Sequence, residues 1–156
     1  MCTQGQSEVK ITLGSFYGPP YGPLTAKEVA SLTQLFQIVT KDAWPMIGDA
    51  KQNWKRPRPF VAHPDLNPCA KREESFSYPS GHMALARYYM HFLIDLFPER
   101  KKVFEERARA IGDDRMVVGV HYPSDVRDGA LLGDQIYEHL AQNKKIRDLI
   151  ALPQLH

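Results

Sequence analysis

The stretch "YPSGHMALARYYMHFLIDLFP", residues 78–98, decides the fold of this chain. From His82 to Phe97 its apolar side chains recur with the period of an α-helix. Ser80 stands where a helix N-cap is favoured, and Pro98 cannot continue a helix. The stretch therefore predicts one well-bounded helix with a broad apolar face, which needs other helices to cover it.

The segment before this helix has a second helical pattern. Residues 24–40, "LTAKEVASLTQLFQIVT", combine apolar periodicity with a capping-box spacing between Thr25 and Glu28. The next residues, 41–54, are expected to form a short helix broken by Pro45, because proline removes a backbone donor and its ring clashes with the preceding turn. The N-terminal half thus supplies at least one amphipathic helix.

After the central stretch, a helix is predicted from Pro98 to Gly119, and a last helix is predicted to begin at Ser124. No run of residues alternates as a strand does, so the sequence predicts an all-α fold. The 156 residues fit one domain, 1–156, with a turn-rich N-terminal segment at 1–24.

Composition limits the classes of partner. The chain is 43% hydrophobic and 24% charged with a net charge of +2, which is ordinary for a globular protein. Because the basic cluster "KQNWKRPRP" is local, no nucleic-acid partner is expected. No transmembrane span is expected either, because the richest apolar run is interrupted by polar side chains (Arg87, His91 and Asp95). The start has no apolar signal core, which fits a cytosolic protein or a mature form without its export segment.

The metal-ligating residue types show no ligand spacing. Cys2 and Cys69 are too few for a disulfide framework or a cysteine zinc site, and whether they pair is left open. The acidic residues near the C-terminal half lack the spacing of a calcium loop (Asp113, Asp114, Asp125 and Asp128). We therefore expect no metal.

A long connection precedes the central helix. Residues 55–81 contain five prolines, which exclude a long regular element. Structureless segments above about 15 residues are uncommon in compact domains unless they are functional. This one lies between basic residues and "PSGH", and that position predicts a site.

The charged groups around this connection suit an anion. Lys51, Arg58 and Arg115 supply a point charge and two planar forks, and the free N–H groups at the start of the helix at His82 add a partial positive charge. Gly81 lets the backbone approach the anion closely. The other basic residues are interpreted as a solvated rim (Lys55, Arg56, Lys71 and Arg72).

Two histidines could turn an anion site into a phosphoryl-transfer site. His121, four residues before Asp125, is the candidate nucleophile, because a carboxylate on one ring nitrogen leaves the lone pair of the other free. His82, at the helix start, is the candidate general acid. Gly119 lets the chain turn back after Arg115, so that the side chains of Arg115 and His121 can reach one pocket.

Each of these residues also has an ordinary structural interpretation. Ser80 could be only an N-cap, Asp125 only a helix-dipole partner, and His121 only a surface histidine. The remaining histidines are interpreted as structural or exposed (His63, His91, His139 and His156). The combination, rather than any single residue, favours phosphoryl transfer.

The combination also resembles a known signature. Lys51, six residues and Arg58-Pro59, then "PSGH" at 79–82, then Arg115, five residues, His121, three residues and Asp125 are similar to the three motifs of the type 2 phosphatidic acid phosphatase superfamily. That superfamily includes bacterial class A non-specific acid phosphatases and vanadium-dependent haloperoxidases. Three departures are Asp114 at a usual serine position, Met83 after the motif histidine, and a short chain.

The resemblance implies a helical bundle of the acid phosphatase and vanadium haloperoxidase type. It implies that His121 forms a phosphohistidine, that Asp125 orients it and that His82 is the general acid. It also implies hydrolysis without a metal or other cofactor, with vanadate binding as a phosphate mimic. The implied phosphate ligands are Lys51, Arg58, Ser80, Gly81 and Arg115.

We therefore expect a phosphatase for small phosphomonoesters. The alternatives are a lipid phosphate or pyrophosphate phosphatase at a membrane surface, a vanadium-dependent haloperoxidase and a catalytically silent phosphate binder. The resemblance favours a periplasmic or secreted location and leaves the cytoplasm open. The sequence also leaves open whether the chain forms a homo-oligomer.

Overall fold

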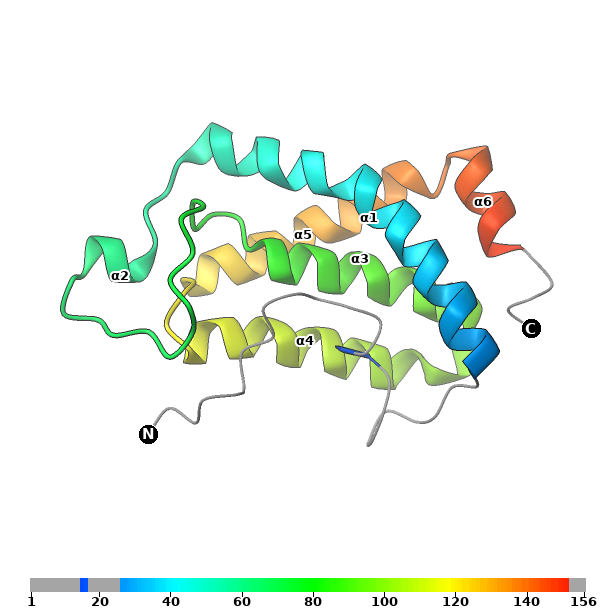
Figure 1. Ribbon diagram of the computed structural model, residues 1–156, viewed down its shortest axis with the longest axis horizontal. Coiled ribbons are helices and arrows are strands. Elements are labelled where there is room, and N and C mark those ends of the chain that lie inside the picture. The colour runs from blue at the N-terminus through cyan, green and yellow to red at the C-terminus, as the bar shows by residue number, and fades with distance from the viewer. Residues whose placement is uncertain (1–14, 17–25, 152–156) are drawn as a thin grey trace.

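The computed structural model describes residues 15–16 and 26–151. No strand occurs in these ranges, which confirms the predicted all-α fold. The segment 1–24, including Cys2, lies outside the described residues except for 15–16, and so does Thr25 of the expected capping box. The helices (Figure 1) are α1 (Ala26–Trp54), α2 (Pro59–Ala62), α3 (Gly81–Leu96), η2 (Pro98–Arg100), α4 (Lys101–Val117), α5 (Pro123–Leu140) and α6 (Lys144–Ile150).

The central helix α3 packs against α1, α4 and α5 (Figure 1). Most of its side chains are buried, and Tyr88 and Phe92 are fully so. Burying side chains of this size stabilises a fold by about 1.5–3 kcal/mol each. The Ser80 hydroxyl accepts a hydrogen bond from the Met83 amide at 3.3 Å, which confirms the predicted N-cap. The apolar stretch that predicts the fold thus forms its core.

Two glycines of α5 set how closely it approaches α3. A Cβ atom at Gly129 would lie 2.6 Å from the Ser80 carbonyl oxygen, and one at Gly133 would collide with the Ala84 carbonyl. Close backbone contact therefore fixes the start of α3 against the first turns of α5. The backbone N–H of Ser80 donates to the carbonyl of Asp125 at 2.9 Å, which holds the same two helix ends together.

One prediction for the N-terminal half is wrong. The helix does not break at Pro45: α1 continues through this residue to Trp54. Proline costs one backbone hydrogen bond, but the apolar face keeps its helical period on both sides of it, and Ala43 and Ile47 are both buried in the core. Pro45 itself is exposed, so its ring meets solvent.

The C-terminal half follows the prediction, with one addition. Gly119 has φ +78°, which reverses the chain after α4, and α5 begins at Pro123, one residue before the expected start. The short helix α6 was not predicted, because its sequence has little apolar periodicity. It is held by Ile146, which is buried in the main core.

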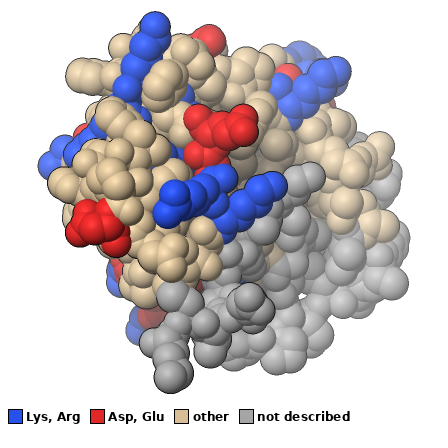
Figure 2. All heavy atoms as spheres, turned by 60° about the vertical axis from the view of Figure 1, so that its left-hand side comes forward, with Lys and Arg blue, Asp and Glu red and all other residues tan. Residues whose placement is uncertain are grey.

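The end of α1, the start of α3, the end of α4 and the start of α5 meet at one end of the bundle, on the left of Figure 1. The connection between α2 and α3 covers this end. Figure 2 brings this side of the molecule forward and shows basic and acidic side chains close to one another on the surface. Across the described ranges, no helix has the length and apolar character needed to cross a membrane.

Candidate active site

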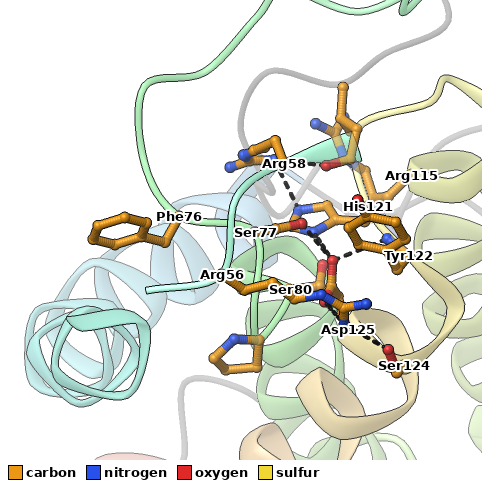
Figure 3. A network of polar contacts seen from close by, with 12 residues as sticks. Arg56, Arg58, Phe76, Ser77, Ser80, Arg115, His121, Tyr122, Ser124 and Asp125 are labelled. Atoms are coloured by element: carbon orange, nitrogen blue, oxygen red, sulfur yellow. Dashed lines mark hydrogen bonds and ion pairs between the residues drawn. The ribbon is translucent and has the colours of Figure 1, made fainter. Parts of the chain in front are cut away.

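His121 and Asp125 form a buried pair at the junction of α4 and α5. Nδ1 of His121 lies 3.3 Å from Oδ2 of Asp125, and Nε2 lies 3.1 Å from Nη1 of Arg58 (Figure 3). A carboxylate only accepts hydrogen bonds and a guanidinium only donates them. Nδ1 therefore carries the proton, and Nε2 presents its lone pair to Arg58.

The surroundings keep this histidine neutral. Burial lowers the pKa of His121 to about 4; the hydrogen bond to Asp125 opposes this shift, and the charges of Arg58 and Lys51 add to it. Burial alone would raise the pKa of Asp125, but hydrogen bonds from His121, Ser77 and the Tyr122 amide hold it below its usual value. At neutral pH the pair is a neutral imidazole beside an ionised carboxylate.

Asp125 has further partners that the sequence did not indicate. Its Oδ2 accepts hydrogen bonds from the Ser77 hydroxyl and, at 2.9 Å, from the Tyr122 amide. Its Oδ1 accepts from Nη1 of Arg56 at 2.9 Å, and the same nitrogen donates to the Ser124 hydroxyl at 2.7 Å. Asp125 is thus both the helix-start acceptor and the partner of the histidine.

The interpretation of Arg56 as part of a solvated rim is wrong. Its guanidinium lies over the Tyr122 ring, 4.0 Å from the centroid, and forms an ion pair with the fully buried carboxylate of Asp125. This pairing offsets the cost of burying that charge. Lys55, Lys71 and Arg72 are exposed, as expected for a rim.

Lys51 fastens the connection that covers the site. Its ammonium donates to the carbonyl oxygens of Phe76 at 2.7 Å and Pro79 at 2.8 Å. Burial, together with the charge of Arg58, lowers the pKa of Lys51 to about 8. The cation therefore lies at the start of α3, where the sequence placed it, and also orders the backbone there.

The two arginines meet at a carboxylate that the sequence analysis did not single out. Nη2 of Arg58 lies 2.7 Å from Oε2 of Glu73, and Nη2 of Arg115 lies 3.0 Å from Oε1. Burial alone would raise the pKa of Glu73, but Arg58, His82 and Arg115 lower it more strongly. Glu73 is therefore ionised and bridges two guanidinium groups that are almost fully buried.

The "PSGH" residues divide into two groups. Ser80 is fully buried, and its hydroxyl caps α3. A direct contact of this hydroxyl with phosphate stays a prediction. Gly81 and His82 line the cavity described next, and His82 is partly exposed there.

A cavity of about 330 Å³ opens onto this cluster. Five of the predicted site residues line it: Lys51, Arg58, Gly81, His82 and His121. Asp125 lies buried behind His121, and Arg115 reaches the cavity wall through Glu73. Trp44, Ile47 and Phe76 form the apolar part of the lining. The cavity thus joins an anion-binding end to an apolar wall.

Over the part of the chain that the structure describes, no group of three or more His, Cys, Asp or Glu side chains is arranged to hold a metal ion. Positive charge in the site comes from lysine and arginine. Such an arrangement can hold a phosphate, offer it a neutral imidazole nitrogen and place a second histidine at the cavity wall.

Comparisons with known proteins agree with this geometry. The sequence model of the PAP2 superfamily matches residues 31–135. The chain is 31% identical over 114 residues to an acid phosphatase of Zymomonas mobilis, covering 70% of this chain and 43% of that one. It is 30% identical over 109 residues to a non-specific acid phosphatase of Providencia stuartii, covering 67% and 44%. The chain spans less than half the length of either relative.

A solved structure is similar in fold. The crystal structure of a transmembrane PAP2 type phosphatidylglycerolphosphate phosphatase from Bacillus subtilis superposes with a TM-score of 0.56 at 27% identity. The match covers 72% of this chain and 59% of that one. The helices that carry the site therefore have the arrangement of a known helical fold.

Proposed function

Because this chain belongs to the PAP2 superfamily, we propose that it is a phosphatase that hydrolyses phosphomonoesters through a covalent phosphohistidine at His121. One observation carries the proposal. The Nδ1–H of His121 faces the buried carboxylate of Asp125, and its Nε2 lies against Arg58 at a cavity that Arg58 and Lys51 line.

The reaction takes two steps. In the first, the cations hold the phosphate while Nε2 of His121 attacks phosphorus and the bond to the leaving oxygen breaks, as His82 donates its proton to that oxygen. Asp125 stabilises the positive charge that develops on His121. In the second step water attacks phosphorus, His82 takes a proton from it, and the P–N bond breaks to release inorganic phosphate.

We propose that this chemistry needs no metal. Phosphoryl transfer depends mainly on positioning and on charge stabilisation of the phosphate oxygens. Here Lys51 and Arg58 line one end of the cavity and Arg115 lies behind Glu73, while the amides at the start of α3 add a partial positive charge.

The cavity suits a small ester with an apolar leaving group. Its volume is about 330 Å³, and Trp44, which is 57% exposed, stands at its wall beside Ile47. A lipid phosphate is the second candidate, because the chain is similar in fold to a phosphatidylglycerolphosphate phosphatase. The periplasmic or secreted location and any homo-oligomer stay predictions.

The first test is hydrolysis of p-nitrophenyl phosphate in the presence of a chelator. The full chain should release p-nitrophenol, His121→Ala should abolish turnover, and the exposed His139→Ala should not. Denaturing the enzyme in alkali during turnover of phosphate-labelled substrate should trap a phosphohistidine, whose P–N bond survives base, in the full chain but not in His121→Ala. Turnover that persists in His121→Ala would refute the assigned nucleophile.

Phosphate binding without turnover would mean a silent binder, and bromide oxidation with added vanadate would mean a haloperoxidase.

A further inference from the structure

Glu73 lies where the proposed function needs a phosphate. Its two carboxylate oxygens are divided between Arg58, at 2.7 Å, and Arg115, at 3.0 Å. Carboxylate and phosphate both present paired oxygens to the planar fork of arginine. The same Arg58 guanidinium contacts Nε2 of His121 at 3.1 Å, so an anion held there is beside the nucleophile.

The Arg58 guanidinium keeps its position without Glu73. Arg58 also donates to the Ser75 carbonyl at 2.9 Å, to the Ser75 hydroxyl at 2.9 Å and to the Val120 carbonyl at 3.1 Å. These bonds fix its guanidinium from the side of the protein. Removing the carboxylate therefore leaves Arg58 oriented, with the N–H that faced Glu73 available to another anion.

Glu73 itself can leave. It belongs to the connection between α2 and α3, and its side chain is 34% exposed, whereas the side chains of Arg58 and Arg115 are 2% and 5% exposed. A rotation of its side chain would move its charge toward solvent without opening the core. The structure thus combines a fixed pair of cations with a displaceable anion.

We propose that Glu73 is an internal competitor of the substrate: it occupies the phosphate position between Arg58 and Arg115 and is displaced when phosphate binds. This inference rests on the proposed function, because it takes the natural anion of the site to be a phosphate. The carboxylate keeps the buried guanidinium charges paired while no ligand is bound. It does so at the expense of affinity for every phosphate ligand.

The test is calorimetric binding of inorganic phosphate to the full chain at constant salt. Glu73→Gln keeps the shape and removes the charge, so phosphate should bind about tenfold more tightly, the effect of losing one charge-assisted interaction. The matched control is Glu74→Gln, which removes the same charge from the next residue, an exposed one on the same cavity. Its dissociation constant should stay within about twofold of that of the unaltered chain.

Unchanged or weaker phosphate binding by Glu73→Gln would overturn the proposal, because it would mean that Glu73 supports the arginines. So would an equal gain in both variants, which would reflect general charge alone. If Glu73→Gln does not fold, Glu73→Asp decides, since it keeps the charge but reaches both arginines less well and should also bind phosphate more tightly. Phosphate binding can be measured without turnover. A chain that binds phosphate but is inactive would therefore refute the proposed reaction, while the dissociation constants of Glu73→Gln and Glu74→Gln could still be compared.

Discussion

Two histidine–aspartate pairs occur among residues 15–16 and 26–151, and the shorter one is not in the candidate site. Nε2 of His91 lies 2.8 Å from Asp134, between α3 and α5, whereas Nδ1 of His121 lies 3.3 Å from Asp125. Distance alone therefore does not identify the pair that can do chemistry.

The pairs differ in what surrounds them. Asp134 is about a quarter exposed, forms a two-point ion pair with Arg87, and its partner His91 stacks on Tyr137. These contacts tie α3 to α5. His121 is buried and turns its second nitrogen toward Arg58 at the cavity instead. A histidine–aspartate pair is reactive when the nitrogen away from the carboxylate faces a substrate.

Replacing the two carboxylates should give the largest contrast. Asp125→Asn should lower kcat for p-nitrophenyl phosphate by about a thousandfold or more, because the imidazole loses both its fixed tautomer and its charge partner. Asp134→Asn should leave kcat within about twofold. Circular dichroism should confirm that both variants are folded, and similar losses of kcat in both would remove the distinction between the pairs.

The pH profile of kcat/KM should separate the candidate site from an ordinary histidine. His121 must be neutral to attack, and burial lowers its pKa to about 4. Activity should therefore persist on the acid side until about pH 4, and it should fall at higher pH once the general acid has lost its proton. Full profiles with p-nitrophenyl phosphate would measure this, and an acid limb near pH 6.5, the usual pKa of histidine, would contradict it.

The His91–Asp134 pair should contribute to the stability of the fold. Asp134→Asn should lower the free energy of unfolding by about 1 kcal/mol, because it removes a two-point ion pair that is only partly exposed. Urea denaturation measures this effect. The exposed pair Lys144–Asp148 offers a control, and Asp148→Asn should change stability less. Equal losses would mean that the Arg87 contact contributes nothing special.

The smallest effect is expected from replacing Arg56 or Arg87, the arginines that pair with Asp125 and Asp134. Arg56 lies on Asp125 and disfavours a second positive charge nearby, so Arg56→Gln should raise the pKa of His121 and move the acid limb upward by about half a pH unit. Arg87→Gln should not move it. An unmoved limb in Arg56→Gln would mean that the charge of Arg56 does not affect the pKa of His121.

Much of the fold was predictable because helical periodicity and caps are local signals. The apolar period marks α3, Ser80 marks its start, and Gly119 marks the turn after α4. Pro45 misled the prediction, since packing on both sides of a proline is a tertiary effect. The prediction of a single domain stays a prediction.

The residues that carry the motif spacing were also predictable, and the structure brings them together around one cavity. Glu73 and Arg56 were not, because each acts on a partner far along the chain, 42 residues away for Glu73 with Arg115 and 69 for Arg56 with Asp125. In sequence, both look like ordinary charges of a solvated loop. Only the folded chain shows that Glu73 bridges two buried arginines and that Arg56 pairs with the buried carboxylate of Asp125.

In alkaline solution, Lys51 can lose its charge and still keep the hydrogen bonds that hold the connection before α3. With a pKa of about 8, this side chain becomes a neutral amine at a pH where most lysines are still charged. A neutral amine retains two N–H groups, enough for the Phe76 and Pro79 carbonyls that it holds. The covering connection can therefore stay fastened while the pocket loses one of its charges, so mild alkali would weaken the hold on phosphate before it loosened the protein.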